Sequence, residues 1–310
     1  MRRITERLLS SIFPRFEPAA TLRPSAQPPR TRAGVQIRWL GTAGFVISSE
    51  RANIVIDPYL TRAGFDDLCA PLIPDEAELR RRLPSCVDAI VCGHSHFDHL
   101  LDAPLAARMT GAKFVGSRSS VAFARASGVT NERIVEVAGA TRLVLEHAEV
   151  RLFPSLHARI ALGRVPFAGE VRSPVVLPAP MWRYRVGGAY GVLVETGGVR
   201  VYHNGSADLV DAELEGVRAD VVLVGLAGRQ VTPNYLERLL RLLAPRVVIP
   251  AHHDSMFTPL DAGVRLLPGV DFAGFLRDVA CLAPKARVIA PRYDESVWVG
   301  ESADEAFIVH

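Results

Sequence analysis

The sequence predicts a layered α/β sandwich in which helices cover two central sheets. Short β-rich runs dominate each half of the 310-residue chain, and segments with helical spacing follow them. The composition, 49% hydrophobic and 22% charged, is ordinary for a globular chain long enough to bury a substantial core. We expect one domain over residues 36–310, preceded by a flexible tail rich in arginine and proline over residues 1–35.

The first half opens with strands. The runs "VQIRWL" (35–40), "GFVIS" (44–48) and "NIVID" (53–57) are separated by turn residues and predict an antiparallel meander. Asp75 is expected to cap a helix with Glu78 as its capping-box partner, and Pro84 to end that helix. In the rest of this half we expect a buried strand at 88–92, a helix at 100–109, a strand at 113–116, a second helix at 118–126 and further short strands within 133–153.

The second half repeats this pattern after an irregular segment. Residues 158–187 contain several Pro, Gly and Arg residues and are expected to form a long loop or lid, a kind of segment that is often functional in compact domains. Beyond it we expect strands at 189–196, 199–204, 220–226 and 246–250, and helices at 233–244 and 271–283.

Charge and cysteine usage exclude several classes of protein. A formal net charge of +3 argues against a dedicated nucleic-acid surface. The four cysteines show no CxxC spacing, so we expect no disulfide framework and no thiolate zinc site, and a reducing cytoplasmic location fits best. No apolar run reaches the roughly 18 residues of a membrane span. The start, "MRRITERLLSSIFPRF", is either part of the flexible tail or a short amphipathic anchor that contacts lipid head groups.

The stretch "GHSHFDHL" (93–100) contains a cluster of potential metal ligands. Three of the nine histidines and one aspartate lie within six positions of it. His94 and His96, two residues apart, can share one metal ion, and Asp98 and His99 can reach a second ion beside it. Imidazole and carboxylate suit zinc, iron or manganese. A solvent-exposed turn with histidines present by chance is the alternative, which this density disfavours.

The pattern His94-x-His96-x-Asp98-His99 matches the signature of the metallo-β-lactamase superfamily. "IRWLGTAGFVI" and "IVIDPYL" resemble the opening strands of the branch that includes ascorbate-6-phosphate lactonase and N-acylphosphatidylethanolamine phospholipase D. The resemblance covers about residues 36–260 and implies a four-layer αββα sandwich, with two mixed sheets flanked by helices. It also implies that His157 is the third ligand of the first metal and that His252 completes the second. His253 is adjacent, and a shift of one residue would exchange the two.

One position departs from the family's pattern. The aspartate that bridges the two metals in many members is replaced by Ser206 in "VYHNGSADL". Serine is a poor metal ligand compared with a carboxylate, so the second ion is expected to bind more weakly or to be a different metal. Asp208 either substitutes for the missing aspartate or is a plain surface carboxylate. His203 is expected behind the ligands or facing the substrate.

These residues predict a metal-dependent hydrolase. A metal ion with an open coordination position supplies hydroxide at neutral pH, so we expect a metal-bound hydroxide to attack a small ester, lactone or phosphodiester. Two zinc ions are the first expectation, with manganese or iron as alternatives. Asp98 is expected to orient the water, and His253 or His203 to protonate the leaving group.

The sequence leaves alternatives open for the class of substrate and for the activity. Five arginines of the expected lid favour an anionic substrate or are simply solvent-facing charge: Arg159, Arg164, Arg172, Arg183 and Arg185. The competing functions are a nucleic-acid-cleaving member of the same superfamily, and a degenerate scaffold that binds metal without catalysis.

Overall fold

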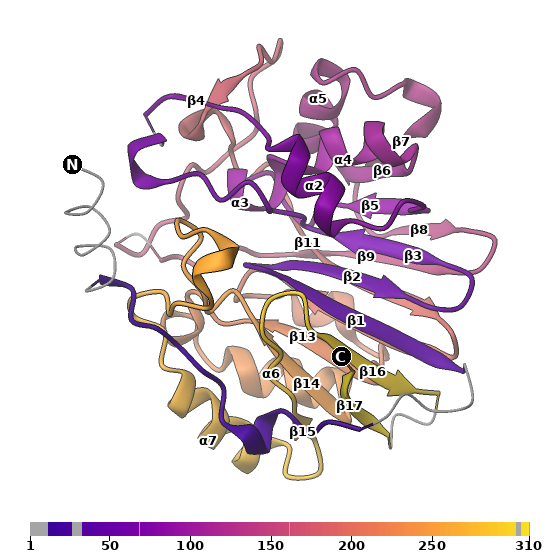
Figure 1. The fold of residues 1–310 in the computed structure, drawn as a ribbon, viewed down its shortest axis with the longest axis vertical. Coiled ribbons are helices and arrows are strands. Elements are labelled where there is room, and N and C mark those ends of the chain that lie inside the picture. Colours follow the sequence, from indigo (N-terminus) through magenta and orange to yellow (C-terminus); the bar gives the residue numbers. More distant parts are fainter. Residues whose placement is uncertain (1–11, 27–32, 68, 161, 302–304, 310) are drawn as a thin grey trace.

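The computed structural model describes residues 12–26, 33–67, 69–160, 162–301 and 305–309. Two sheets face each other across the centre of the molecule (Figure 1). The first has the order β17-β16-β1-β2-β3-β5-β6-β7 and the second the order β15-β14-β13-β12-β11-β9-β8. In Figure 1, α2, α4 and α5 lie on one side of this pair of sheets, and α6 and α7 lie on the other. The predicted four-layer αββα sandwich is confirmed.

The first sheet joins an antiparallel part to a parallel part. The pairs β1·β2 and β2·β3 are antiparallel, as the meander predicted, whereas β3, β5, β6 and β7 run parallel. Its strands are β1 (Gly34–Gly41), β2 (Gly44–Ser48), β3 (Asn53–Ile56), β5 (Ala89–Val91), β6 (Lys113–Ser117), β7 (Ile134–Val137), β16 (Ser296–Gly300) and β17 (Ala306–Val309).

The second sheet has the same mixed character. Strands β8, β9, β11 and β12 pair antiparallel, and β12, β13, β14 and β15 pair parallel. Its strands are β8 (Thr141–Val144), β9 (Glu149–Ser155), β11 (Ala189–Thr196), β12 (Val199–Asn204), β13 (Val221–Gly225), β14 (Val247–Ala251) and β15 (Arg287–Val288). A separate pair, β4 (Pro71–Leu72) and β10 (Ala179–Pro180), joins the lid segment to the chain before α2.

The helices cover the outer faces because the strands alternate their apolar side chains. In β3, Ile54 and Ile56 pack between the two sheets, whereas Val55 packs toward the helices of the first sheet. The helices are α2 (Glu76–Arg82), α3 (Phe97–Leu100), α4 (Ala103–Thr110), α5 (Arg118–Ala126), α6 (Tyr235–Leu243) and α7 (Phe272–Leu282). A third core cluster lies between the second sheet, α6 and α7.

Some predictions of local structure are confirmed and others are wrong. The side chain of Asp75 accepts hydrogen bonds from the amides of Ala77 and Glu78, which confirms it as the cap of α2. The capping box is wrong, because the carboxylate of Glu78 pairs with Arg81 and Arg82 instead. The sequence reading also missed β16 and β17, which pair beside β1, and the short helix α3.

The expected tail is partly ordered against the rest of the chain. Residues 12–26 run along the C-terminal half of the sequence: the amide of Phe16 donates to Val264, and the amide of Leu266 donates to Pro14. Phe13 is buried, and the ring of Phe16 lies 4.6 Å from that of Phe272. Aromatic burial therefore corrects the flexible-tail expectation for this stretch. Residues 1–11, where the amphipathic anchor was expected to begin, lie outside the described residues.

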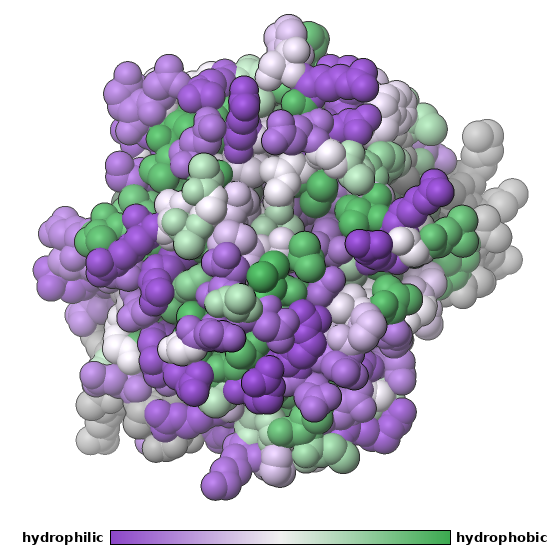
Figure 2. Space-filling model, turned by 180° about the vertical axis from the view of Figure 1, so that it is seen from behind, coloured by the Kyte–Doolittle hydropathy of each residue, from purple (hydrophilic) through white to green (hydrophobic). Residues whose placement is uncertain are grey.

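The surface agrees with a core that takes up most large apolar side chains. On the face seen from behind, hydrophilic residues predominate and hydrophobic ones form small separate groups (Figure 2). In the part of the chain that the structure describes, no helix is long and apolar enough to cross a membrane.

Candidate metal centre

The candidate site lies where several strands of both sheets end. Strand β3 runs parallel to β5, and β12 runs parallel to β14 through β13, so their C-terminal ends meet at common sheet edges. Asp57, His94, His157, Ser206 and His252 follow directly, or within three residues, the ends of β3, β5, β9, β12 and β14. Such edges are where α/β folds commonly bind ligands.

The first candidate triad is His94, His96 and His157, with one ligand atom of each within 4.8 Å of the others. Nε2 of His94 and Nδ1 of His96 are 3.1 Å apart. The rings of His96 and His157 each have a backbone partner that fixes their orientation. Nε2 of His96 lies 2.9 Å from the carbonyl oxygen of Pro166, and Nδ1 of His157 lies 2.8 Å from that of Ala158. Nδ1 of His96 and Nε2 of His157 are therefore left to face a metal ion.

The second candidate triad is Asp98, His99 and His252, and all three side chains are buried. Helix α3 begins just before Asp98 and presents this carboxylate and His99 from one helical turn. The carboxylate Oδ2 of Asp98 lies 3.3 Å from Nε2 of His252 and 3.7 Å from Nε2 of His99. The rings of His94 and His99 are 3.8 Å apart, so the two triads adjoin.

Electrostatics keep the imidazoles of the first triad neutral and the carboxylate of the second triad ionised. Burial lowers the pKa of His96 to about 3 and that of His157 to about 4, and it holds the pKa of His94 well below its usual value. Burial alone would raise the pKa of Asp98, but His99 and His252 outweigh it and lower the pKa. Five imidazoles and one ionised carboxylate form a donor set that fits zinc, manganese or iron.

The sequence reading missed Asp57, which supports the second triad. Its carboxylate is fully buried and accepts from the amide of Gly93 at 2.7 Å, while the other oxygen lies 2.8 Å from Nδ1 of His99. This carboxylate and that of Asp98 raise the pKa of His99 against the effect of burial. A carboxylate behind a ligating histidine fixes the ring's tautomer and orientation. The signal in the sequence was a lone aspartate at the end of an apolar strand, before Pro58.

A second buried network stands behind His252. The amide of His252 donates to the carbonyl of Thr42 at 2.8 Å, and the amide of Thr42 donates back to the carboxylate of Asp254 at 2.9 Å. Asp254 is fully buried, pairs with Arg62 at 3.0 Å and accepts a hydrogen bond from the hydroxyl of Tyr293 at 2.7 Å. These contacts hold the loop after β14 against the turn between β1 and β2.

A cavity of about 210 Å³ opens over both triads. Its walls come from α3, the lid segment and the loops after β12 and β14. Five of the six candidate ligands line it, together with Ser206. The oxygen of Ser206 accepts from the amide of Ala158 at 3.2 Å.

Two predicted site residues lie elsewhere. The carboxylate of Asp208 is 3.3 Å from the guanidinium of Arg238 and accepts from the amide of Leu209, so it does not replace the missing bridging aspartate. His253 stacks on Trp39 at 4.8 Å and contacts Phe16 and Phe272, away from the cavity. Burial lowers the pKa of His253 to about 4. The expectation that His253 takes part in catalysis is corrected, because its ring belongs to an aromatic cluster.

His203 is also turned away from the cavity. Its Nε2 lies 2.8 Å from the carbonyl oxygen of Ala43, and its Nδ1 lies 4.0 Å from the carboxylate of Asp57. It is fully buried and does not line the cavity over the triads. Of its two expected positions, behind the ligands or facing the substrate, the structure shows the first.

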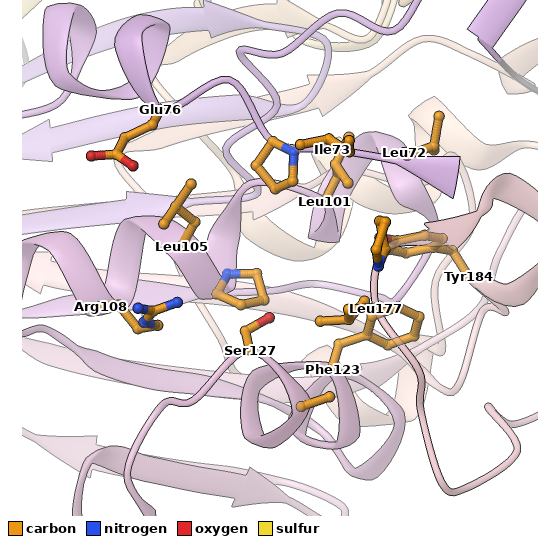
Figure 3. A pocket seen from close by; sticks show the side chains of 14 residues that line it. Leu72, Ile73, Glu76, Leu101, Leu105, Arg108, Phe123, Ser127, Leu177 and Tyr184 are labelled. Carbon is orange, nitrogen blue, oxygen red and sulfur yellow. The ribbon is translucent and has the colours of Figure 1, made fainter. Parts of the chain in front are cut away.

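A second cavity, of about 460 Å³, lies apart from the triads, between α4, α5 and the chain on either side of β4 and β10. Figure 3 shows its apolar walls, which include Leu101, Phe123, Leu177 and Tyr184, and the charged side chains of Glu76 and Arg108 toward one side. None of the six candidate ligands lines this second cavity. Of these two cavities, the smaller one is therefore the cavity that opens onto the candidate metal ligands.

Comparison with known proteins agrees with the geometry. A family model described as the β-lactamase superfamily domain matches residues 36–252. This chain belongs to the metallo-β-lactamase superfamily. It is 28% identical to a UPF0173 metal-dependent hydrolase from Methanopyrus kandleri, over 73% of this chain and 87% of that protein. A relative of the same description from Aeropyrum pernix is 29% identical, over 71% of this chain and 83% of its own length.

Solved structures share the fold at lower identity. Igni18, a metallo hydrolase from Ignicoccus hospitalis, superposes with a TM-score of 0.58 at 21% identity and covers 85% of this chain and 97% of its own. An isothiocyanate hydrolase from Delia radicum gut bacteria gives a TM-score of 0.51 at 16% identity, covering 89% and 99%. The family and the sequence relatives make this chain a metal-dependent hydrolase of the superfamily.

Proposed function

We propose that this chain hydrolyses a small ester, lactone or phosphodiester with the help of two divalent metal ions. Zinc is the first candidate, because five imidazoles and one carboxylate without a thiolate suit it, and manganese and iron are the alternatives. One observation carries the proposal: two three-residue ligand sets adjoin at the base of one cavity, with the rings of His94 and His99 3.8 Å apart.

Each set has its role in this proposal. His94, His96 and His157 would hold one ion, and Asp98, His99 and His252 would hold the other. Bound metal ions lower the pKa of a coordinated water and polarise the bond to be cleaved. Asp98 supplies the single carboxylate of the candidate ligand set, and its charge favours the orientation of an attacking water. The oxygen of Ser206 already accepts a hydrogen bond from Ala158, so its proton is free to be donated to a substrate oxygen in the cavity.

The alternatives fit the site less well. Cleavage of nucleic acid needs cationic side chains that follow a phosphate backbone, and among the described residues no arginine or lysine lines the cavity. A degenerate scaffold should have lost several ligands, whereas six candidate ligands and the supporting carboxylate of Asp57 lie in place. The branch that contains the lactonase and the phospholipase, and a cytoplasmic location, stay as predictions. The four cysteines, all free thiols, agree with that location.

The test is hydrolysis by the full chain loaded separately with zinc, manganese or iron. We expect turnover of 4-nitrophenyl hexanoate, of a γ-lactone or of bis(4-nitrophenyl) phosphate, and loss of this turnover when a chelator removes the metal. The variant with both His94→Ala and His96→Ala is the control for contaminating activity. Protein that holds two ions per chain and turns over none of the three substrates would overturn the proposed function.

A further inference from the structure

The walls of the cavity over the two triads are almost wholly apolar. The lid contributes Ile160, Phe167 and Met181, and the loops after β14 contribute Met256, Phe257 and Leu267. Ile160 is 48% exposed and Phe167 is 36% exposed, so the apolar character continues to the rim. A substrate that reaches the metal centre must therefore pass and contact hydrocarbon and aromatic surfaces.

Charge is missing from these walls. Apart from the candidate ligands, Ser206 is the only polar side chain among the described lining residues. None of the five lid arginines lines the cavity, and the guanidinium of Arg185 donates to the carbonyl of Ala168 at 2.8 Å. An anionic substrate was expected only because of those arginines. An anionic group placed against these walls would lose its hydration without gaining a partner, which is costly.

We propose that this cavity selects a neutral carboxylic ester or lactone with a short alkyl or aryl group, and discriminates against substrates that carry an anionic group on the part that contacts the walls, away from the bond to be cleaved. The proposal rests on the proposed hydrolytic function and narrows it to one substrate class. The volume of about 210 Å³ sets the size of the group that can be buried. It lies below the roughly 300–1,000 Å³ usual for small-molecule pockets, which favours a small acyl or aryl group over a long chain.

Matched substrates test this selection on the metal-loaded full chain. The pair is 4-nitrophenyl hexanoate and 4-nitrophenyl 4-sulfobutanoate, since a sulfonate keeps its charge and does not attack its own ester. We expect kcat/KM for the neutral ester to be higher by at least about tenfold, the lower end of what apolar pockets achieve. Equal or reversed preference overturns the proposal. That result leaves the proposed hydrolytic function standing.

A charge introduced at the rim should change the preference. Ile160→Arg places a cation on the cavity wall at a position that is already half exposed. We expect it to raise the relative kcat/KM for the sulfonate ester by about tenfold, the order of a single contact in such a pocket. The matched control is Leu162→Arg, because Leu162 lies on the same lid, is fully exposed and does not line the cavity. An equal shift in both variants would mean that bulk attraction, and not the cavity wall, sets the preference, and would overturn the proposal.

Binding gives a readout that does not need turnover. The chain has four methionines, of which Met181 and Met256 line the cavity and Met109 does not. With ¹³C-methyl methionine in the zinc-loaded protein, titration with hexan-1-ol should shift the Met181 and Met256 resonances in a saturable way and leave Met109 unchanged. No shift at either cavity methionine overturns the proposed apolar site. Shifts in protein that turns over neither the esters, nor the lactone, nor the phosphodiester would leave the cavity assignment and refute the hydrolytic function.

Discussion

The two candidate metal triads adjoin, yet the protein holds them by different means. In the first triad, the orienting partners of His96 and His157 are the carbonyls of Pro166 and Ala158 in the irregular lid segment. In the second, buried charged groups stand behind the ligands: Asp57 behind His99, and the pair of Asp254 and Arg62 behind His252. The first triad therefore depends on a loop, and the second depends on the polar interior of the fold.

Backbone geometry sharpens the contrast. Thr42, Asp57, Arg62 and His252 all have positive φ, between 44° and 50°, and all four belong to the second triad or to its support. Non-glycine residues in this region cost about 1–3 kcal/mol each and persist where surrounding contacts determine them. None of the three residues of the first triad has positive φ. The lid also carries two such residues, Leu162 and Phe167, but neither is a candidate ligand or orients one, so the strained residues lie nearer to the ligands in the second triad.

Removal of both central ligands of the first triad should have the largest effect on activity. We expect His94→Ala with His96→Ala to lose one bound ion and to lower hydrolysis by about 10³-fold, which corresponds to several kcal/mol of lost charge stabilisation. Metal content by elemental mass spectrometry and initial rates measure both effects. His147→Ala, at a histidine that pairs with Glu146 outside the triads, is the control. Wild-type activity in the double variant would remove metal participation from the account.

Breaking the buried ion pair should affect the second triad selectively. Arg62→Met leaves the carboxylate of Asp254 buried without its cation, so we expect the free energy of unfolding to fall by about 3–5 kcal/mol. The second ion should also be released at lower chelator concentration, while the first is retained. Arg62→Lys, which keeps the charge, should restore part of both quantities. Equal weakening of the two ions in a stepwise chelator titration would show that the network does not act through His252.

Loss of the carboxylate behind His99 should act on metal affinity rather than on folding. We expect Asp57→Asn to weaken the second ion by about 10–100-fold, the usual range for a partner that orients a ligating histidine. Asp88→Asn is the matched control, since Asp88 accepts from the amide of Asn53 at the opposite end of the same strand pair. If the two variants bind the second ion equally well, the hydrogen bond from His99 to Asp57 has no role in metal binding.

A carboxylate placed at the bridging position should bring the metal affinity of the second triad closer to that of the first. Ser206 lines the cavity, where an aspartate can reach a metal ion. We expect Ser206→Asp to tighten the second ion by about tenfold or more, at least the scale on which partners behind the ligands act. Competition with a chromophoric chelator measures the change. Unchanged affinity would indicate that water, and not a protein carboxylate, suffices between the ions.

The smallest effect is expected at Asp208. Its carboxylate pairs with Arg238, so Asp208→Asn should leave metal content and affinity unchanged for both ions. The free energy of unfolding should fall by less than about 1 kcal/mol, because the pair is partly exposed. The same chelator titration checks this. Release of the second ion at lower chelator concentration would return Asp208 to the ligand set.

The sequence indicated four of the six candidate ligands, divided between the two triads, because the chemistry of that stretch is local. His94, His96, Asp98 and His99 are close in the chain, and the strands at 44–48, 189–196 and 199–204 match the observed bounds. His157 and His252 were placed only through the family resemblance, since nothing local distinguishes a ligand histidine from a buried one. His253, one residue on, shows the difficulty: its ring faces Trp39 and Phe16, contacts between distant parts of the chain.

The support of the second triad could not be predicted for the same reason. Asp57 and His99 are 42 residues apart, and Arg62 and Asp254 are brought together by the packing of both halves of the fold. The missed strand β17 lies at the end of the chain but pairs beside β16, next to β1. Such contacts arise from tertiary packing rather than from periodicity. Of the two alternatives for the lid arginines, an anionic substrate gains no support from the cavity walls, which they do not line, and the charge of the substrate stays a prediction.

Metal content per chain tests the central claim most directly. The protein should be purified without added metal or chelator, loaded with zinc, and measured by elemental mass spectrometry beside the His252→Ala variant. Two adjoining triads predict about two ions per chain, and about one in the variant. A wild-type protein that binds no ion after zinc, manganese and iron have each been offered would contradict the account of a binuclear hydrolase.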